Sequence, residues 1–198
     1  MRDGIIVAFA GPQGAGKQRI AREIAARIPE AQIIKGVTTA TKSLREGHRS
    51  ISASEFVRQQ SRQELLISNL TGGEWFGGNS YGLEKSSIGE CLTTDSKIGL
   101  LILEEGALEP LQEFIRSLKR DPEKSLVLIF VVPPDKDVLA ERLEHRDEAG
   151  VEVALRVEGI KVWEPYVTGF PAQMLYNKGP IEDTVRDAIQ IITRRLPS

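Results

Sequence analysis

GPQGAGKQ at residues 11–18 is the stretch that decides the fold. It follows the apolar run IIVAFA at 5–10 and precedes a segment with helical spacing. Glycine adopts backbone angles closed to other residues, so successive N–H groups in such a loop can turn inward around an anion. The N-terminus of the following helix also favours phosphate. The stretch therefore predicts a P-loop, whose nucleotide-binding residues would be Gly11, Gly14, Ala15, Gly16, Lys17 and Gln18.

The last position of this motif departs from its usual pattern. G-x-x-x-x-G-K-[ST] is met except that Gln18 stands where a hydroxyl normally holds Mg²⁺. An amide oxygen can still reach Mg²⁺ or a water bound to it. We therefore expect Mg²⁺ beside a bound phosphate group, with Gln18 on the metal side and Lys17 as a mobile positive charge beside the phosphates.

The composition is that of an ordinary soluble globular chain. In 198 residues, 40% are hydrophobic and 27% charged, and the net charge of -2 gives no basic footprint for nucleic acid. Cys91 is the only cysteine, so an intrachain disulfide is impossible. No apolar run is long enough to span a membrane. We expect one domain in the cytoplasm that binds small nucleotides as a monomer or homodimer, without nucleic acid or membrane partners.

Short apolar runs separated by helical stretches predict an α/β fold with a central parallel sheet and helices on both faces. Residues 38–95 and 141–158 fit this pattern poorly and are predicted to be insertions over the P-loop end of the sheet, where ligands of open α/β sheets bind. A Ser54 cap is expected for the second helix and an Asp135 cap for the fourth. Strands are expected at 5–10, 32–37, 98–103, 126–132 and 174–176, and helices at 17–28, 54–70, 108–119, 136–144 and 181–194.

Three arginines in the second insertion are candidates for catalysis. Arg142, Arg146 and Arg156 could close over a transferring phosphoryl group, offset its charge and exclude water. The alternative is a solvated helix face, because acidic residues lie among them at helical spacing. The arginines alone do not decide between these two interpretations.

Several further segments, taken in order, carry a resemblance to a known family. GVTTATKSLREG at 36–47 is similar to a T-T-R-x-x-R-x-G segment, and EWFGGNSYG at 74–82 to an E-W…G-N-Y-Y-G segment. LILEEGA at 101–107, FVVPPDKDVLAERLEHR at 130–146 and YNKGPIE at 176–182 follow in the matching order. Together with the P-loop, these segments resemble the guanylate kinase family along nearly the whole chain.

The resemblance implies a P-loop NTPase three-layer fold and transfer of the ATP γ-phosphoryl group to GMP or dGMP. Its three parts would be a core (1–37, 96–140 and 157–198), a nucleoside monophosphate (NMP) lobe at 38–95 and a lid at 141–156. The lid would supply the three arginines, and Asn177 would border the adenine of ATP. The acceptor phosphate would be held by Lys42, Arg45 and Tyr81, and guanine would be read by Thr38, Glu74 and Glu104.

The acceptor half departs from the family pattern more than the donor half. Lys42 replaces a planar, bidentate arginine, and Leu83 and Ile102 replace polar residues. The segment between Gly47 and Phe56 is about six residues shorter than usual, judged from motif spacing. Two alternatives therefore stay open: a kinase of the same fold for another phosphorylated acceptor, such as another nucleotide or a sugar phosphate, and a binding module with little catalysis.

Overall fold

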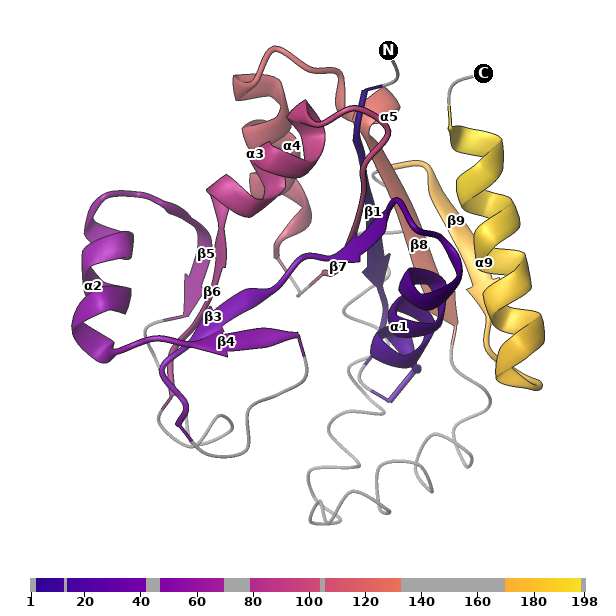
Figure 1. Ribbon diagram of the computed structural model, residues 1–198, viewed down its shortest axis with the longest axis horizontal. Coiled ribbons are helices and arrows are strands. Elements are labelled where there is room, and N and C mark those ends of the chain that lie inside the picture. Colours follow the sequence, from indigo (N-terminus) through magenta and orange to yellow (C-terminus); the bar gives the residue numbers. More distant parts are fainter. Residues whose placement is uncertain are drawn as a thin grey trace.

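A five-stranded parallel sheet forms the centre of the molecule in the computed structural model (Figure 1). Its order is β2-β7-β1-β8-β9, so the chain leaves the middle strand first to one side and later to the other. The strands are β1 (Ile5–Ala10), β2 (Ala31–Ile33), β7 (Ile98–Ile102), β8 (Leu126–Val132) and β9 (Ala172–Tyr176). The structure describes residues 3–12, 14–41, 47–69, 79–103, 106–132 and 170–196.

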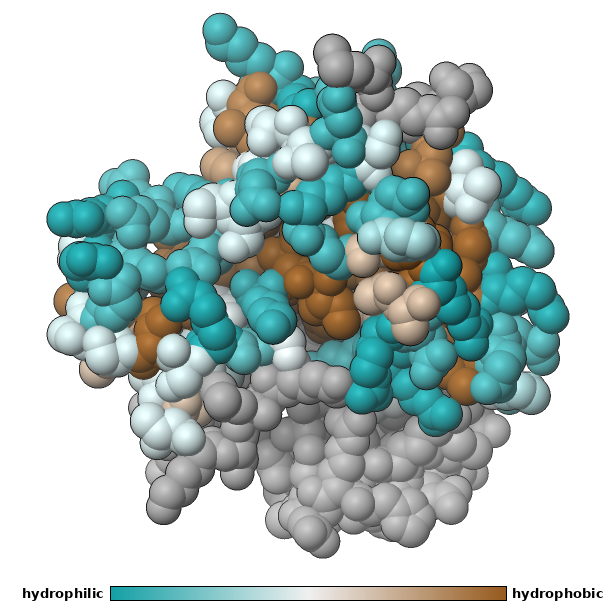
Figure 2. All heavy atoms as spheres, viewed as in Figure 1, coloured by the Kyte–Doolittle hydropathy of each residue, from teal (hydrophilic) through white to brown (hydrophobic). Residues whose placement is uncertain are grey.

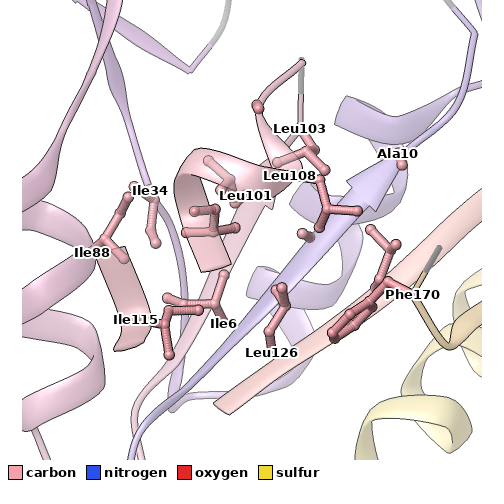
Figure 3. Packing of buried hydrophobic residues seen from close by; sticks show 14 of the residues in the cluster. Ile6, Ala10, Ile34, Ile88, Leu101, Leu103, Leu108, Ile115, Leu126 and Phe170 are labelled. Atoms are coloured by element: carbon pink, nitrogen blue, oxygen red, sulfur yellow. The ribbon is translucent and has the colours of Figure 1, made fainter. Parts of the chain in front are cut away.

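Helices cover both faces of this sheet, and β1 explains why. All six of its residues are buried, and because successive side chains point to opposite faces, Ile6 and Ala8 join one core cluster while Val7 and Phe9 join the other. The first cluster packs under α3 (Lys85–Thr93) and α4 (Leu108–Ser117), as Figure 3 shows around Ile6. The second packs under α1 (Lys17–Arg27) and α9 (Ile181–Arg195).

A smaller sheet projects to one side of the main sheet, at the left of Figure 1. Its order is β4-β3-β6-β5, and α2 (Ala53–Ser61) packs on it. The buried hydrophobic residues of its own core are Val37, Phe56 and Leu65. Its strands are β3 (Gly36–Thr38), β4 (His48–Ser50), β5 (Leu65–Asn69) and β6 (Tyr81–Glu84).

The outer faces of α2 and α9 are hydrophilic in the view of Figure 2, and hydrophobic residues show between them. A short helix, α5 (Pro122–Ser125), leads into β8 and is capped by Asp121, whose side chain accepts a hydrogen bond from the backbone N–H of Glu123. None of the helices in the described parts of the chain is long and apolar enough to cross a membrane.

The main-sheet predictions are largely confirmed, and two segments are corrected. Residues 32–37 were expected to form one strand, but they divide between β2 and β3, which belong to different sheets. Residues 54–70 were expected to form one helix, but α2 ends at Ser61 and β5 begins at Leu65. Gln63 takes a left-handed φ of 56° between them, which ends the helical path. The helix expected at 136–144 and its Asp135 cap lie outside the described residues.

The N-terminal cap of α2 is also corrected. Ser52, rather than Ser54, is the cap, and its hydroxyl accepts a hydrogen bond from the N–H of Glu55 at 3.1 Å. Strands β4, β5 and β6 and helices α3 and α5 were not predicted. Helix α3 lies within the predicted 38–95 insertion, yet its buried residues Ile88, Cys91 and Leu92 pack in a core cluster of the main sheet.

Candidate functional site

The P-loop lies where β1 ends and α1 begins, at the carboxyl edge of the parallel sheet. Gly11, Gly14 and Gly16 take φ values of 126°, 83° and 95°, which side-chain-bearing residues rarely adopt. A Cβ on Gly11 would lie 2.6 Å from the carbonyl oxygen of Val131, and one on Gly16 would lie 2.5 Å from the Asn177 amide nitrogen. Gly11 and Gly16 are therefore required both by conformation and by space, and Gly14 by conformation.

The start of α1 is suited to bind an anion. Its N-cap is Gly16 in the left-handed region, with no side chain capping the helix and no acidic residue in the first turn. Amide N–H groups at this end thus keep their capacity to bind a phosphate, which the helix dipole also favours. Gln18 is half-buried in the same turn. The predicted contacts Gly14, Ala15, Gly16 and Gln18 are therefore brought together at one helix end.

Lys17 folds back over the loop. Its Nζ donates hydrogen bonds to the carbonyl oxygens of Gly11 at 2.6 Å and Pro12 at 2.8 Å. These bonds hold a positive charge at the mouth of the glycine loop. An ammonium group on a flexible stem can exchange carbonyl partners for phosphate oxygens. The charge of Lys17 and the backbone geometry of the glycine loop therefore both favour a phosphate ligand.

Asn177 reaches this loop from the far end of the chain. It directly follows β9, and its side chain, in a residue only 5% exposed, donates from Nδ2 to the Ala15 carbonyl oxygen at 2.8 Å. Its Oδ1 accepts from the Thr184 hydroxyl at 3.2 Å. Sequence reasoning placed Asn177 beside the nucleotide but missed Thr184. The available signal was a polar residue on the otherwise apolar, buried face of α9.

Of the residues expected to bind the acceptor, Thr38 and Tyr81 are brought together. They pair across β3 and β6 in antiparallel register, and Tyr81 also packs edge-to-face on His48 with ring centroids 5.4 Å apart. Tyr81 is half-buried. Thr38 is fully buried, and its Oγ1 accepts a hydrogen bond from the N–H of Ala40. The other expected site residues, Lys42, Arg45, Glu74, Glu104, Arg142, Arg146 and Arg156, lie outside the described residues.

A central strand that runs into a glycine-lined anion cradle defines the chain as a P-loop α/β protein. The chain is 28% identical over 193 residues to a guanylate kinase of Chlorobium luteolum, covering 96% of this chain and 90% of that protein. It is 32% identical over 143 residues to a guanylate kinase of Prochlorococcus marinus, covering 71% of each. The chain belongs to the guanylate kinase family.

The fold has a matching counterpart among solved structures. The guanylate kinase of Anaplasma phagocytophilum superposes with a TM-score of 0.67 at 19% identity, covering 100% of this chain and 89% of that chain. This likeness concerns the fold. No family model matches the chain.

Proposed function

We propose that this chain transfers the γ-phosphoryl group of ATP to GMP or dGMP. A phosphate oxygen of the acceptor bonds to the γ-phosphorus as the bond to the β–γ bridging oxygen breaks, which yields the nucleoside diphosphate and ADP. The observation that carries this proposal is the cradle of positive-φ glycines under the Lys17 ammonium, in a chain of the guanylate kinase family.

Catalysis of this transfer needs positioning and charge stabilisation rather than a covalent intermediate. Lys17 and the loop N–H groups would hold the donor phosphates. We assign Arg142, Arg146 and Arg156 to closure over the transferring group, where they offset its charge in the transition state. Single alanine changes there should lower kcat more than they weaken ATP binding.

The acceptor would lie against the smaller sheet. Lys42, Arg45 and Tyr81 would hold its phosphate, and Glu74 and Glu104 would read guanine by accepting hydrogen bonds from N1–H and the exocyclic amine. Adenine carries an acceptor where guanine has that N1–H donor. Thr38 is buried, and its hydroxyl oxygen already accepts a hydrogen bond from the N–H of Ala40. It would therefore contact guanine only after a movement of the lobe exposes the hydroxyl.

Mg²⁺ is the cation that this chemistry implies. In the residues that the structure describes, no three His, Cys, Asp or Glu side chains gather into a metal site. Mg²⁺ on nucleotides is commonly held by one or two protein ligands together with the phosphates, and the Gln18 amide oxygen is of the hard kind that it accepts. We assign Gln18 to that contact. When bound, Mg²⁺ neutralises charge on the donor phosphates.

The test is ADP release with ATP and Mg²⁺ across GMP, dGMP, AMP, UMP and CMP. GMP or dGMP should give the highest kcat/KM, and Lys17→Ala should remove the signal, which excludes a contaminating kinase. If AMP, UMP or CMP is the better acceptor, the guanine assignment is wrong. If none releases ADP above background while ATP still binds, the chain is a binding module instead.

A further inference from the structure

The Asn177 amide joins three parts of the molecule that are distant in sequence. Its backbone N–H donates to the Val132 carbonyl oxygen at the end of β8, its Nδ2 donates to Ala15 in the P-loop, and its Oδ1 accepts from Thr184 in the first turn of α9. Both polar atoms of the side chain are thus engaged. Since a carbonyl can only accept, Nδ2 must face Ala15, and the orientation of the amide is unambiguous.

This contact fixes the peptide between Ala15 and Gly16. In a trans peptide the carbonyl and the following N–H point in opposite directions. With the Ala15 carbonyl directed at Asn177, the Gly16 N–H is directed away from Asn177. Gly16 also begins α1 in the left-handed region, at the point where an anion would approach the helix. Rotating this peptide would turn a carbonyl oxygen toward the anion and the N–H away from it.

We propose that Asn177, held by Thr184, is a positioning residue that orients the Ala15–Gly16 peptide so that the Gly16 N–H serves the donor phosphates. This inference rests on the proposed binding of ATP at the P-loop. It gives Asn177 a role different from bordering adenine, because the side chain is buried and committed to the loop backbone. Ala15 is itself fully buried, so its carbonyl oxygen relies on the amide rather than on solvent for a hydrogen bond.

The first test compares ATP with inorganic tripolyphosphate, which lacks the base and sugar. Asn177→Asp keeps the shape of the side chain but presents an oxygen to the Ala15 carbonyl oxygen. We expect its Kd for ATP and its Kd for tripolyphosphate to rise by the same factor, about tenfold or more, from one buried hydrogen bond lost and one repulsion gained. The Kd for GMP should stay within about twofold, on the same estimate.

A second pair of variants keeps the test independent of how well Asn177→Asp folds. Thr184→Val keeps the size of the side chain but loses the hydroxyl that holds Asn177, and should weaken both phosphate ligands about threefold. Thr184→Ser restores the hydroxyl and should restore both affinities. A rescue by serine ties the effect to the hydrogen bond rather than to the packing of α9.

Three outcomes would overturn the inference. ATP binding that weakens while tripolyphosphate binding does not would mean that Asn177 serves the base. GMP affinity lost to the same extent as ATP affinity, and not restored by Thr184→Ser, would mean that these residues support the whole fold rather than the P-loop. Unchanged binding in both variant positions would mean that the contact does not orient the loop. These results are separate from the kinase test, because a chain that binds ATP through this loop without phosphorylating GMP would refute the proposed function and leave this inference standing.

Discussion

The main sheet and the smaller sheet are built with very different amounts of core. Every residue of β1 is buried between two hydrophobic clusters, whereas the core of the smaller sheet consists of Val37, Phe56 and Leu65 with Ile51 packed partly against it. Regions with few buried apolar contacts open at low free-energy cost. Leu66, Ile67 and Leu83 of the smaller sheet pack against the main cluster as well, so the two sheets share part of their support. With the proposed function, the donor phosphates would bind on the sheet with the larger core and the acceptor on the sheet with the smaller one.

The largest expected effect is the loss of ATP binding at the P-loop. Lys17→Ala should remove most of the melting-temperature increase caused by ATP, which at a hundredfold excess over Kd corresponds to about 2.7 kcal/mol. Turnover should fall by about a hundredfold or more, because the transition-state charge loses a partner. Lys124→Ala, an exposed lysine in α5, is the matched control. An ATP-induced shift that is the same in Lys17→Ala and wild type would refute the P-loop assignment.

A cavity in the smaller core should act on the acceptor alone. Phe56 is 1% exposed, and Phe56→Ala should cost about 3 kcal/mol or more of local stability. We expect faster hydrogen exchange in β3 and β6 and a higher KM for GMP, with an unchanged Kd for ATP. Leu111→Ala, on the buried face of α4 in the main core, should instead lower global stability by about 3 kcal/mol with little change in the KM for GMP. If both variants weaken ATP binding, the two sheets are not independent.

A smaller effect should separate base recognition from phosphate recognition on the acceptor side. Glu74→Gln should reduce the preference for GMP over AMP by about tenfold, the value of roughly one charge-assisted hydrogen bond. Tyr81→Phe should raise the KM for GMP and AMP equally, because it removes the hydroxyl proposed to bind the acceptor phosphate. The measurement is kcat/KM for both acceptors. Equal loss for both acceptors in Glu74→Gln would remove Glu74 from guanine recognition.

The smallest effect concerns the alkylation of Cys91, whose rate reports on opening of the main-sheet core. Burial beside β1 raises the pKa of its thiol to about 11, so at pH 8 about one thiol in a thousand is ionised. Alkylation should therefore be very slow in the native protein and fast in denaturant, and it should accelerate as pH rises toward 11. Phe56→Ala should not change the native rate. A faster rate in that variant would show that the smaller sheet and the main core open together.

The sequence predicts the main sheet better than the smaller sheet, for a physical reason. In β1 and β8 the apolar runs are continuous because both faces are covered, and that pattern is local. In the smaller sheet, strands such as β4 and β6 are only partly buried and lack a strong period. The run around Leu65 was therefore attached to the preceding helix, because its apolar residues fit either period.

The candidate site follows the same division. The glycine cradle could be predicted because it is a matter of local backbone geometry, set by residues within one loop. The side-chain contacts of Asn177 could not be predicted. Its partner Ala15 is 162 positions away in the chain, and its other side-chain partner, Thr184, belongs to no motif. The burial of Thr38 likewise depends on pairing between β3 and β6 rather than on its neighbours in sequence.

The distance in sequence between Ala15 and Asn177 also concerns the order in which the protein is made. Residues near the N-terminus leave the ribosome first, so a nascent chain carries the complete glycine motif long before the amide that orients it. With the role proposed for Asn177, the growing chain would hold ATP only weakly until β9 and the first turn of α9 have emerged and docked. Full nucleotide affinity would then mark the completion of the fold during synthesis.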